Sequence, residues 1–222
     1  MQDSTTNQAV QLQAGNQNNV EPMVEQINGK NVFVWNAGMT GSQSKVAVLE
    51  NFAKLNPGSK VVVLFTSQGG GVDDCRASYN RMLMLRTFYN MHFTFVILEA
   101  KSCAMWFVQC ADVRIALPYT SMMYHCVKWE LSGAKDQRGF REACEAMDRN
   151  QREFTAILCS RAGDTAKTIA DTLNLVEDGS DHIITPQYAL DNGWIDQIYQ
   201  PKFAKVEGEV DLAGVTIPSQ TN

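Results

Sequence analysis

One serine stands where a nucleophile could be built. Ser102 directly follows an apolar, strand-forming run and opens a short apolar stretch that favours a helix. In α/β proteins the carboxyl end of a buried strand is where active sites lie, and the N–H groups at a helix start can hold a developing oxyanion. The same position also suits a helix-capping serine, so Ser102 alone predicts a cap before it predicts chemistry.

Histidine is scarce, which narrows the search for a base. The chain has His92, His125 and His182 and no other. His125 ends the apolar segment SMMYH, where an ionisable side chain without a partner would be costly. Because a serine hydroxyl needs a base to attack near neutral pH, His125 is the best candidate, with a structural histidine as the alternative. The three histidines lack the spacing of a zinc site, and neither a metal nor another cofactor is expected.

An acid and a glycine turn could complete a hydrolytic site. Asp181 lies in the polar segment EDGSDH, a loop that could return to the serine, although loop acids are commonly solvated. The run SQGGG at 67–71 follows a buried strand, and its glycines let another chain or an anion approach the backbone closely. It lacks the GxGxxG and GK[ST] patterns of phosphate loops, so a plain glycine-rich turn is the alternative.

Alternating strand-like and helix-like segments must position these residues. Apolar and β-branched runs predict five strands, at 31–35, 60–66, 92–98, 113–116 and 121–124. Four helices are predicted: 43–55 from the helical spacing of its apolar residues, 72–89 after the glycine turn, 102–110 as a short apolar stretch, and 135–162 from its polar-apolar pattern. Strand, helix and strand in repeated order predict an α/β fold of right-handed βαβ units.

Length and composition predict one domain with two tails. The chain has 222 residues, of which 45% are hydrophobic, as expected of a globular protein. We predict a flexible polar tail at 1–22, a domain at 23–200 and a C-terminal arm at 201–222. The net charge of −5 without a Lys or Arg run disfavours nucleic acid as a partner. No apolar run approaches the roughly 18 residues of a membrane span.

The cysteines and the N-terminus predict a cytoplasmic location. None of the six cysteines forms a CxxC pair, and most have apolar or helix-forming neighbours. Free buried thiols in a reducing compartment are therefore favoured over a disulfide framework. The N-terminus is polar from its first residues, unlike a secretory signal.

Four segments, taken in order, resemble the proteolytic subunit of Clp protease. SQGGGV (67–72) is similar to the family's Ser-Pro-Gly-Gly-Ser-Val, and AKSCAM (100–105) to its Ala-Ala-Ser-Met-Gly-Ala. RIALPYTSMMYH (114–125) resembles Arg-Tyr-Ala-Leu-Pro-Asn-Ser-Arg-Ile-Met-Ile-His. ALDNGWID (189–196) resembles Ala-Leu-Glu-Tyr-Gly-Leu-Ile-Asp, which places Asp181 on the family's acid. The chain order Ser, His, Asp differs from that of chymotrypsin, subtilisin and the α/β-hydrolases.

The resemblance implies a serine endopeptidase with Ser102 as nucleophile, His125 as base and Asp181 as orienting acid. It implies further that backbone N–H groups of Gly70 and Cys103 hold the oxyanion. The segment that would bind substrate as an added strand comprises Gly69, Gly71 and Val72.

The resemblance also implies an architecture and partners. The fold would be the ClpP/crotonase-like spiral of repeated ββα units, with a protruding handle helix in a segment at about 127–162. Stacked heptameric rings of this one chain would enclose the sites and degrade unfolded polypeptides, with an AAA+ Clp ATPase as a possible partner.

The chain departs from the family pattern in several places. Gln68 replaces a proline, Cys103 and Ala104 replace Met-Gly, and Cys126-Val127 replaces Gln-Pro. The stretch Ile27–Lys30 stands where the family has a longer one ending Asp-Ile-Tyr-Ser-Arg-Leu-Leu, so ATPase docking is the least supported implication.

Other interpretations stay open. A divergent or phage-type member of the same fold, such as a head-maturation peptidase, would keep the chemistry but serve another purpose. A crotonase-like acyl-CoA enzyme would use paired N–H groups without needing the serine, histidine and aspartate together. A catalytically silent ring subunit would only support an active relative. Lys101 beside Ser102 suggests a Ser–Lys dyad, but adjacent residues rarely face one another.

Overall fold

The computed structural model describes residues 23–128 and 136–200. The predicted tail at 1–22, the predicted arm at 201–222 and part of the predicted handle, 129–135, lie outside the described residues. The strands are β1 (Val24–Ile27), β2 (Lys30–Asn36), β3 (Lys60–Ser67), β4 (His92–Lys101), β5 (Val113–Tyr124), β6 (His182–Ile184) and β7 (Gln197–Ile198). The helices are α1 (Gln43–Leu55), α2 (Val72–Phe88), α3 (Ala104–Phe107), α4 (Gln137–Leu158), α5 (Thr165–Leu175) and α6 (Pro186–Asp191), with a 3₁₀ turn η1 (Val108–Cys110) after α3.

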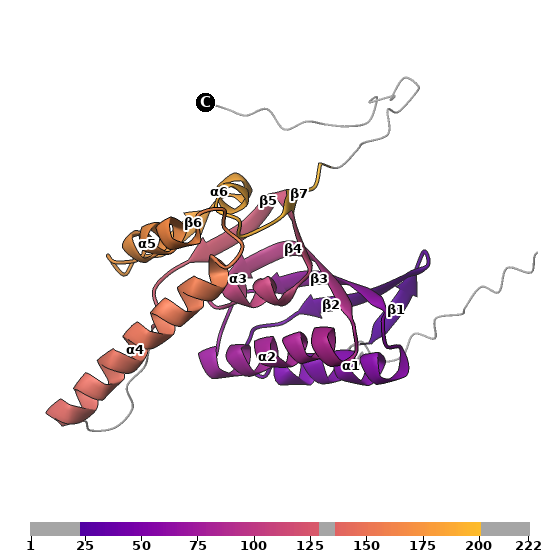
Figure 1. The fold of residues 1–222 in the computed structure, drawn as a ribbon, viewed down its shortest axis with the longest axis horizontal. Coiled ribbons are helices and arrows are strands. Elements are labelled where there is room, and N and C mark those ends of the chain that lie inside the picture. Colours follow the sequence, from indigo (N-terminus) through magenta and orange to yellow (C-terminus); the bar gives the residue numbers. More distant parts are fainter. Residues whose placement is uncertain (1–22, 129–135, 201–222) are drawn as a thin grey trace, which may run out of the picture.

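The described strands form one sheet with a parallel centre. β2, β3, β4 and β5 lie side by side in this order, all parallel, with helices in the connections (Figure 1). β1 pairs with β2 as an antiparallel hairpin, whose turn uses Asn28 and Gly29 at positive φ. At the other edge β5 pairs with both short strands, β7 near its start and β6 at its end. The α/β fold expected from the sequence is confirmed.

Buried aromatic rings fill the layer between the sheet and its helices. Trp35, Phe65, Phe95 and Phe107 are fully buried, and their ring centroids lie 5.0–6.1 Å apart in neighbouring pairs. They come from three adjacent strands and α3, so this cluster fixes the short helix that follows Ser102 against the sheet. All six cysteines are free and four of them are buried.

The predicted and observed bounds of the helices and strands agree best where the sequence pattern is continuous. α1 has the predicted bounds, and α2 ends one residue before its predicted end. The prediction of two strands at 113–116 and 121–124 is wrong, because β5 runs through both. The intervening residues bulge, so that Ala116 pairs with Ile97 and Ser121 with Glu99. Thr120 stabilises the bulge, since its Oγ1 accepts from Leu117 N and donates to Ile97 O, both at 2.8 Å.

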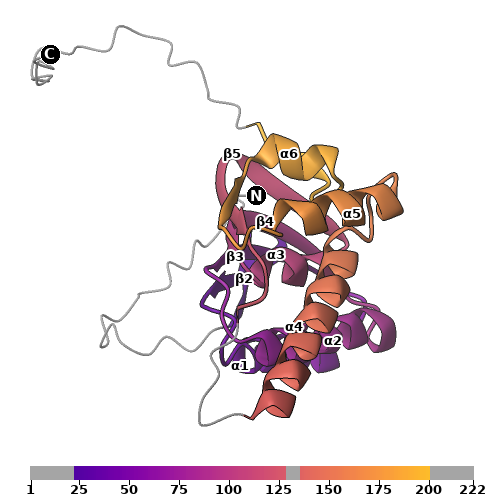
Figure 2. The same cartoon turned by 90° about the vertical axis from the view of Figure 1, so that its left-hand side faces the viewer.

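Helix α4 extends away from the sheet, which both views show (Figure 1 and Figure 2). Asp136 caps its N-terminus by accepting from Gly139 N at 2.7 Å. Only its C-terminal turns are buried, through Phe154, Thr155 and Leu158, whereas Phe140 is half exposed. The helix thus occupies the middle of the predicted handle, and the apolar side predicted for it contacts the domain at one end only. Within the described residues, no helix combines the length and apolar character needed to cross a membrane.

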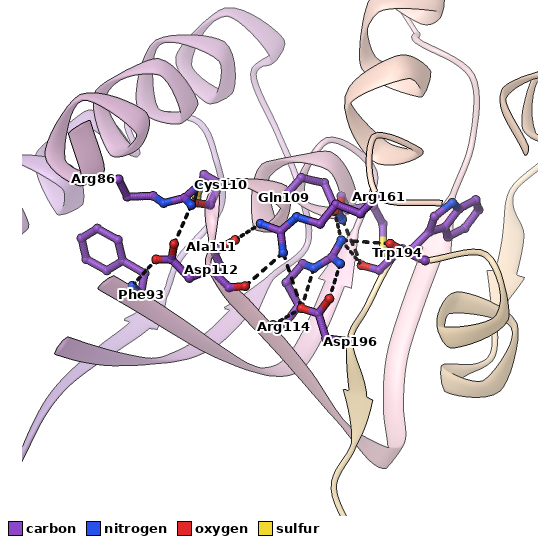
Figure 3. A network of polar contacts seen from close by, with 12 residues as sticks. Arg86, Phe93, Gln109, Cys110, Ala111, Asp112, Arg114, Arg161, Trp194 and Asp196 are labelled. Carbon is purple, nitrogen blue, oxygen red and sulfur yellow. Dashed lines mark hydrogen bonds and ion pairs between the residues drawn. The ribbon is translucent and has the colours of Figure 1, made fainter. Parts of the chain in front are cut away.

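The buried side chain of Arg114, near the start of β5, is hydrogen-bonded to residues 193–196 of the C-terminal segment (Figure 3). Arg114 has a side-chain exposure of 1%, and its guanidinium donates to both carboxylate oxygens of Asp196 at 2.5 and 3.0 Å. It also donates to the carbonyls of Gly193 and Trp194 at 3.0 and 3.2 Å and to the side chain of Gln109. Burial opposes ionisation of Asp196, but hydrogen bonds and charge from Arg114 outweigh it, and the pKa of Asp196 lies below its ordinary value.

Asp196→Asn is expected to lower the free energy of unfolding by about 3 kcal/mol, because Arg114 would stay buried without its counter-ion. Urea unfolding followed by tryptophan fluorescence measures the loss. Asp171→Asn is the matched control, since its ion pair with Lys167 is exposed and should contribute less than about 1 kcal/mol. Equal effects of the two substitutions would contradict the structural role of the buried pair.

Candidate active site

Three neighbouring strand ends gather the residues singled out from the sequence. β3, β4 and β5 are parallel and adjacent, and near their carboxyl ends Ser67 pairs with Ala100 and Lys101 with Met123. The glycine turn follows β3, Ser102 follows β4 and His125 follows β5. Parallel pairing therefore brings residues far apart in sequence to one edge of the sheet.

Ser102 and His125 are in direct contact. Nε2 of His125 lies 2.8 Å from Oγ of Ser102, within hydrogen-bonding distance. Ser102 has φ +54°, a left-handed conformation that costs a non-glycine residue about 1–2 kcal/mol. Two backbone hydrogen bonds maintain it: Ser102 N donates to Met123 O at 2.9 Å, and Met105 N donates to Ser102 O at 3.0 Å. Backbone strain at a residue touching a base is typical of functional sites.

His125 sits in surroundings that favour its neutral form. Burial lowers the pKa of His125, the positive charge of Lys128 lowers it further, and the negative charge of Asp181 acts in the opposite direction. Nδ1 is buried and has no hydrogen-bond partner among the described residues. A neutral imidazole can accept the Ser102 proton through Nε2, so the contact is arranged for base catalysis.

Asp181 lies near His125, but its carboxylate is hydrogen-bonded to Lys128. It directly precedes β6, and the pairing of His182 with Tyr124 brings it beside the end of β5. Its Oδ1 accepts from Nζ of Lys128 at 2.8 Å, and this hydrogen bond keeps the pKa of Asp181 below its ordinary value. Lys128 was missed from the sequence, because nothing local connects it with a residue 53 positions later.

The glycine turn packs directly against Ser102. Gly69 has φ +88°, and a Cβ added there would lie 2.7 Å from Ser102 Cβ. The turn is held from the other side, because Met39 N donates to Gly69 O at 2.7 Å and Gly71 N donates to Thr40 Oγ1 at 2.8 Å. Met39 and Thr40 lie between the first predicted strand and helix, and no sequence pattern selects them.

Two backbone hydrogen bonds set the orientation of the peptides that precede Gly70 and Cys103. Gly69 O points to Met39, and because a trans peptide sets N–H opposite to C=O, the N–H of Gly70 points away from Met39. Likewise Ser102 O accepts from Met105, so the N–H of Cys103 points away from α3. The thiol of Cys103 donates to Gly70 O at 3.5 Å and connects the two segments.

A cavity of about 200 Å³ opens beside the Ser102–His125 pair. Apart from the pair itself, its walls are largely apolar, with contributions from Val72, Trp106, Tyr124, Val127 and Phe154. The rings of Trp106 and Phe154 stack with centroids 4.3 Å apart and form a rigid wall. A larger hollow shares Gly70, Val72, Val127 and Lys128 with this cavity and continues past the glycine turn.

No group of three or more His, Cys, Asp or Glu residues in the part of the chain that the structure covers is arranged to hold a metal ion. Ser102, His125, Gly70 and Cys103 thus lie together at one strand edge, with Asp181 held close by on Lys128.

Comparison with known families gives one match. A family model described as Clp protease covers residues 17–202, which include all the strands and helices above. A search of curated proteins finds no match to this chain. The matched span contains the strand edge at which Ser102 meets His125. This chain therefore belongs to the Clp protease family and is a ClpP-like serine peptidase of the α/β class.

Proposed function

We propose that this chain is an endopeptidase that hydrolyses peptide bonds in unfolded polypeptides, with Ser102 as nucleophile, His125 as general base and Asp181 as orienting acid. The observation that carries the proposal is the 2.8 Å contact between His125 Nε2 and Ser102 Oγ on the wall of a cavity. A serine paired with a neutral imidazole at a concave site is the arrangement that acyl transfer requires.

This geometry supports the following reaction. His125 takes the proton of Ser102 as Oγ attacks the scissile carbonyl, and then gives it to the leaving amine. N–H groups of Gly70 and Cys103 stabilise the negative charge on the carbonyl oxygen. Water, activated by His125, then hydrolyses the acyl-enzyme. Asp181 fixes the imidazole tautomer and stabilises the imidazolium when its carboxylate faces Nδ1.

The substrate backbone would bind along Gly69, Gly71 and Val72 as an added strand. Strand addition uses main-chain hydrogen bonds, which suits a peptidase acting on many sequences. The cavity beside Ser102 would accept an apolar side chain next to the scissile bond, because Trp106, Tyr124 and Phe154 form much of its wall. Lys128 and Gln151 also line this cavity.

We propose a homo-oligomer of stacked heptameric rings, with α4 as the handle between rings. The apolar side of α4 supports this, because Phe140 is half exposed and Cys144 is exposed in the single chain. An AAA+ Clp ATPase, a cytoplasmic location and a divergent or phage-type role belong to the same proposal, as implications of the family.

One observation favours a second candidate, a catalytically silent ring subunit. Asp181 hydrogen-bonds Lys128, and His125 Nδ1 is without a partner in the described residues. A subunit that has lost its activity could keep the contact between Ser102 and His125 while its acid, Asp181, is bound to Lys128 instead of His125.

A serine-directed probe separates the two candidates. A fluorophosphonate is expected to label the assembled protein once per chain, and peptide mapping should place the label on Ser102. Heat-unfolded protein is the control, since an unfolded chain has no activated serine. If the protein assembles correctly but is not labelled, the result would contradict the peptidase and favour the catalytically silent subunit.

A further inference from the structure

We infer that Lys128 is a positioning residue that holds Asp181 away from His125, so that the Ser-His-Asp arrangement is completed only when Asp181 exchanges Lys128 for the imidazole. This inference rests on the proposed function and adds a control element to the same site. Lys128 contacts no reacting atom in this arrangement; it acts through Asp181.

Two facts about hydrogen bonding carry the inference. Asp181 Oδ1 accepts from Lys128 Nζ at 2.8 Å, a charge-assisted contact between two half-exposed side chains. On the imidazole, Nδ1 is buried and has no partner in the described chain. A buried polar nitrogen without a hydrogen bond is unfavourable. A carboxylate that accepted a hydrogen bond from Nδ1 would remove this cost.

The topology places the lysine and the imidazole in competition for one carboxylate. His125 and Lys128 both follow the end of β5, three residues apart, and Asp181 enters from the start of β6, which pairs with that end. The side chains of Lys128 and Asp181 are 56% and 53% exposed. Because exposed ion pairs contribute little net free energy, Asp181 can leave Lys128 at small cost.

The other charged groups nearby do not take this role. The charge of His182 also acts on Asp181, but its Nε2 is engaged by Ser180 Oγ at 2.9 Å and Asp178 Oδ1 at 3.2 Å. For His125 the charges that act are those of Lys128 and Asp181. Lys128 is the cation that holds the acid.

Replacing Lys128 by an uncharged residue should raise the pKa of His125. Burial and then the charge of Lys128 lower the pKa of His125, whereas Asp181 raises it. Removing Lys128 deletes a positive charge and frees Asp181 to reach Nδ1, and both changes raise this pKa. Since the base must be neutral, the acid limb of the rate profile moves to higher pH. A carboxylate on Nδ1 also stabilises the imidazolium formed during attack, so kcat rises.

The test compares Lys128→Met with Lys128→Arg. Two rates are measured against pH in the assembled protein: fluorophosphonate labelling of Ser102, and carbethoxylation of His125 read by mass spectrometry. We expect Lys128→Met to move both acid limbs up by roughly one pH unit. Lys128→Arg should keep the wild-type profile because it keeps the ion pair. Lys167→Met, which breaks an exposed pair on α5, is the matched control and should change neither.

An Asp181→Asn background shows whether Lys128 acts through the acid. If it does, Lys128→Met shifts the profile much less in that background than in the wild type. An equal shift in both backgrounds would mean that Lys128 acts by its own charge and would overturn the inference, as would no shift at all. Absence of Ser102 labelling in the wild type would instead overturn the proposed function, while the carbethoxylation profile of His125 would still decide the role of Lys128.

Discussion

Ser102→Ala is expected to reduce hydrolysis of a short fluorogenic peptide by on the order of 10⁶-fold and to abolish fluorophosphonate labelling. The expected loss is large because Oγ is the atom that forms the acyl-enzyme, and His125 then has nothing to deprotonate. Alanine keeps Cβ and the same backbone cost at φ +54°, so the fold and the glycine turn should be preserved.

Ser121→Ala is the matched control for this loss, because Ser121 is an exposed serine on β5 away from the cavity. Its rate and labelling should equal those of the wild type. Native mass spectrometry should show the same oligomer for both variants. Hydrolysis that persists in a correctly assembled Ser102→Ala protein would exclude Ser102 as the nucleophile.

Gly69→Ala is expected to lower kcat/KM by about 10²- to 10³-fold, the effect of losing an oxyanion donor. The new Cβ would lie 2.7 Å from both Lys101 O and Ser102 Cβ, closer than such atoms can approach. The turn must move away from Ser102, and the N–H of Gly70 moves with it. Steady-state kinetics on the fluorogenic peptide measures the loss, and the rate of Ser102 labelling should fall in parallel.

Gly58→Ala controls for the backbone cost of this substitution. Gly58 has φ +78°, close to the +88° of Gly69, but a Cβ there meets nothing within 4 Å. Gly58→Ala should lose about 1 kcal/mol of conformational stability from the backbone alone and keep its activity, whereas Gly69→Ala should lose more stability and also lose activity. Wild-type kinetics in Gly69→Ala would contradict the role of the turn.

Much of the framework could be predicted from local pattern. The apolar runs of β3 and β4 and the helical spacing of α1 located these elements, because such patterns reflect burial of a whole face. β4 continues three residues beyond its predicted end. Ser102 and His125 could be selected for the same reason, since each stands at the end of such a run. The elements β1, α5, β6, α6 and β7 were not predicted. The strands β6 and β7 are only two or three residues long and depend on their pairing with β5.

For the candidate site, too, some features could be predicted from the sequence and others depend on the tertiary structure. The sequence determined which residue types are available, their order and the family to which they belong, because these are properties of the chain itself. The tertiary structure decided that Ser102 and His125 meet at 2.8 Å, that Gly69 packs on Ser102, and that Asp181 is held by Lys128. These contacts arise from the pairing of β4, β5 and β6, and sequence spacing carries no information about the partner that a loop acid finds once the strands are paired.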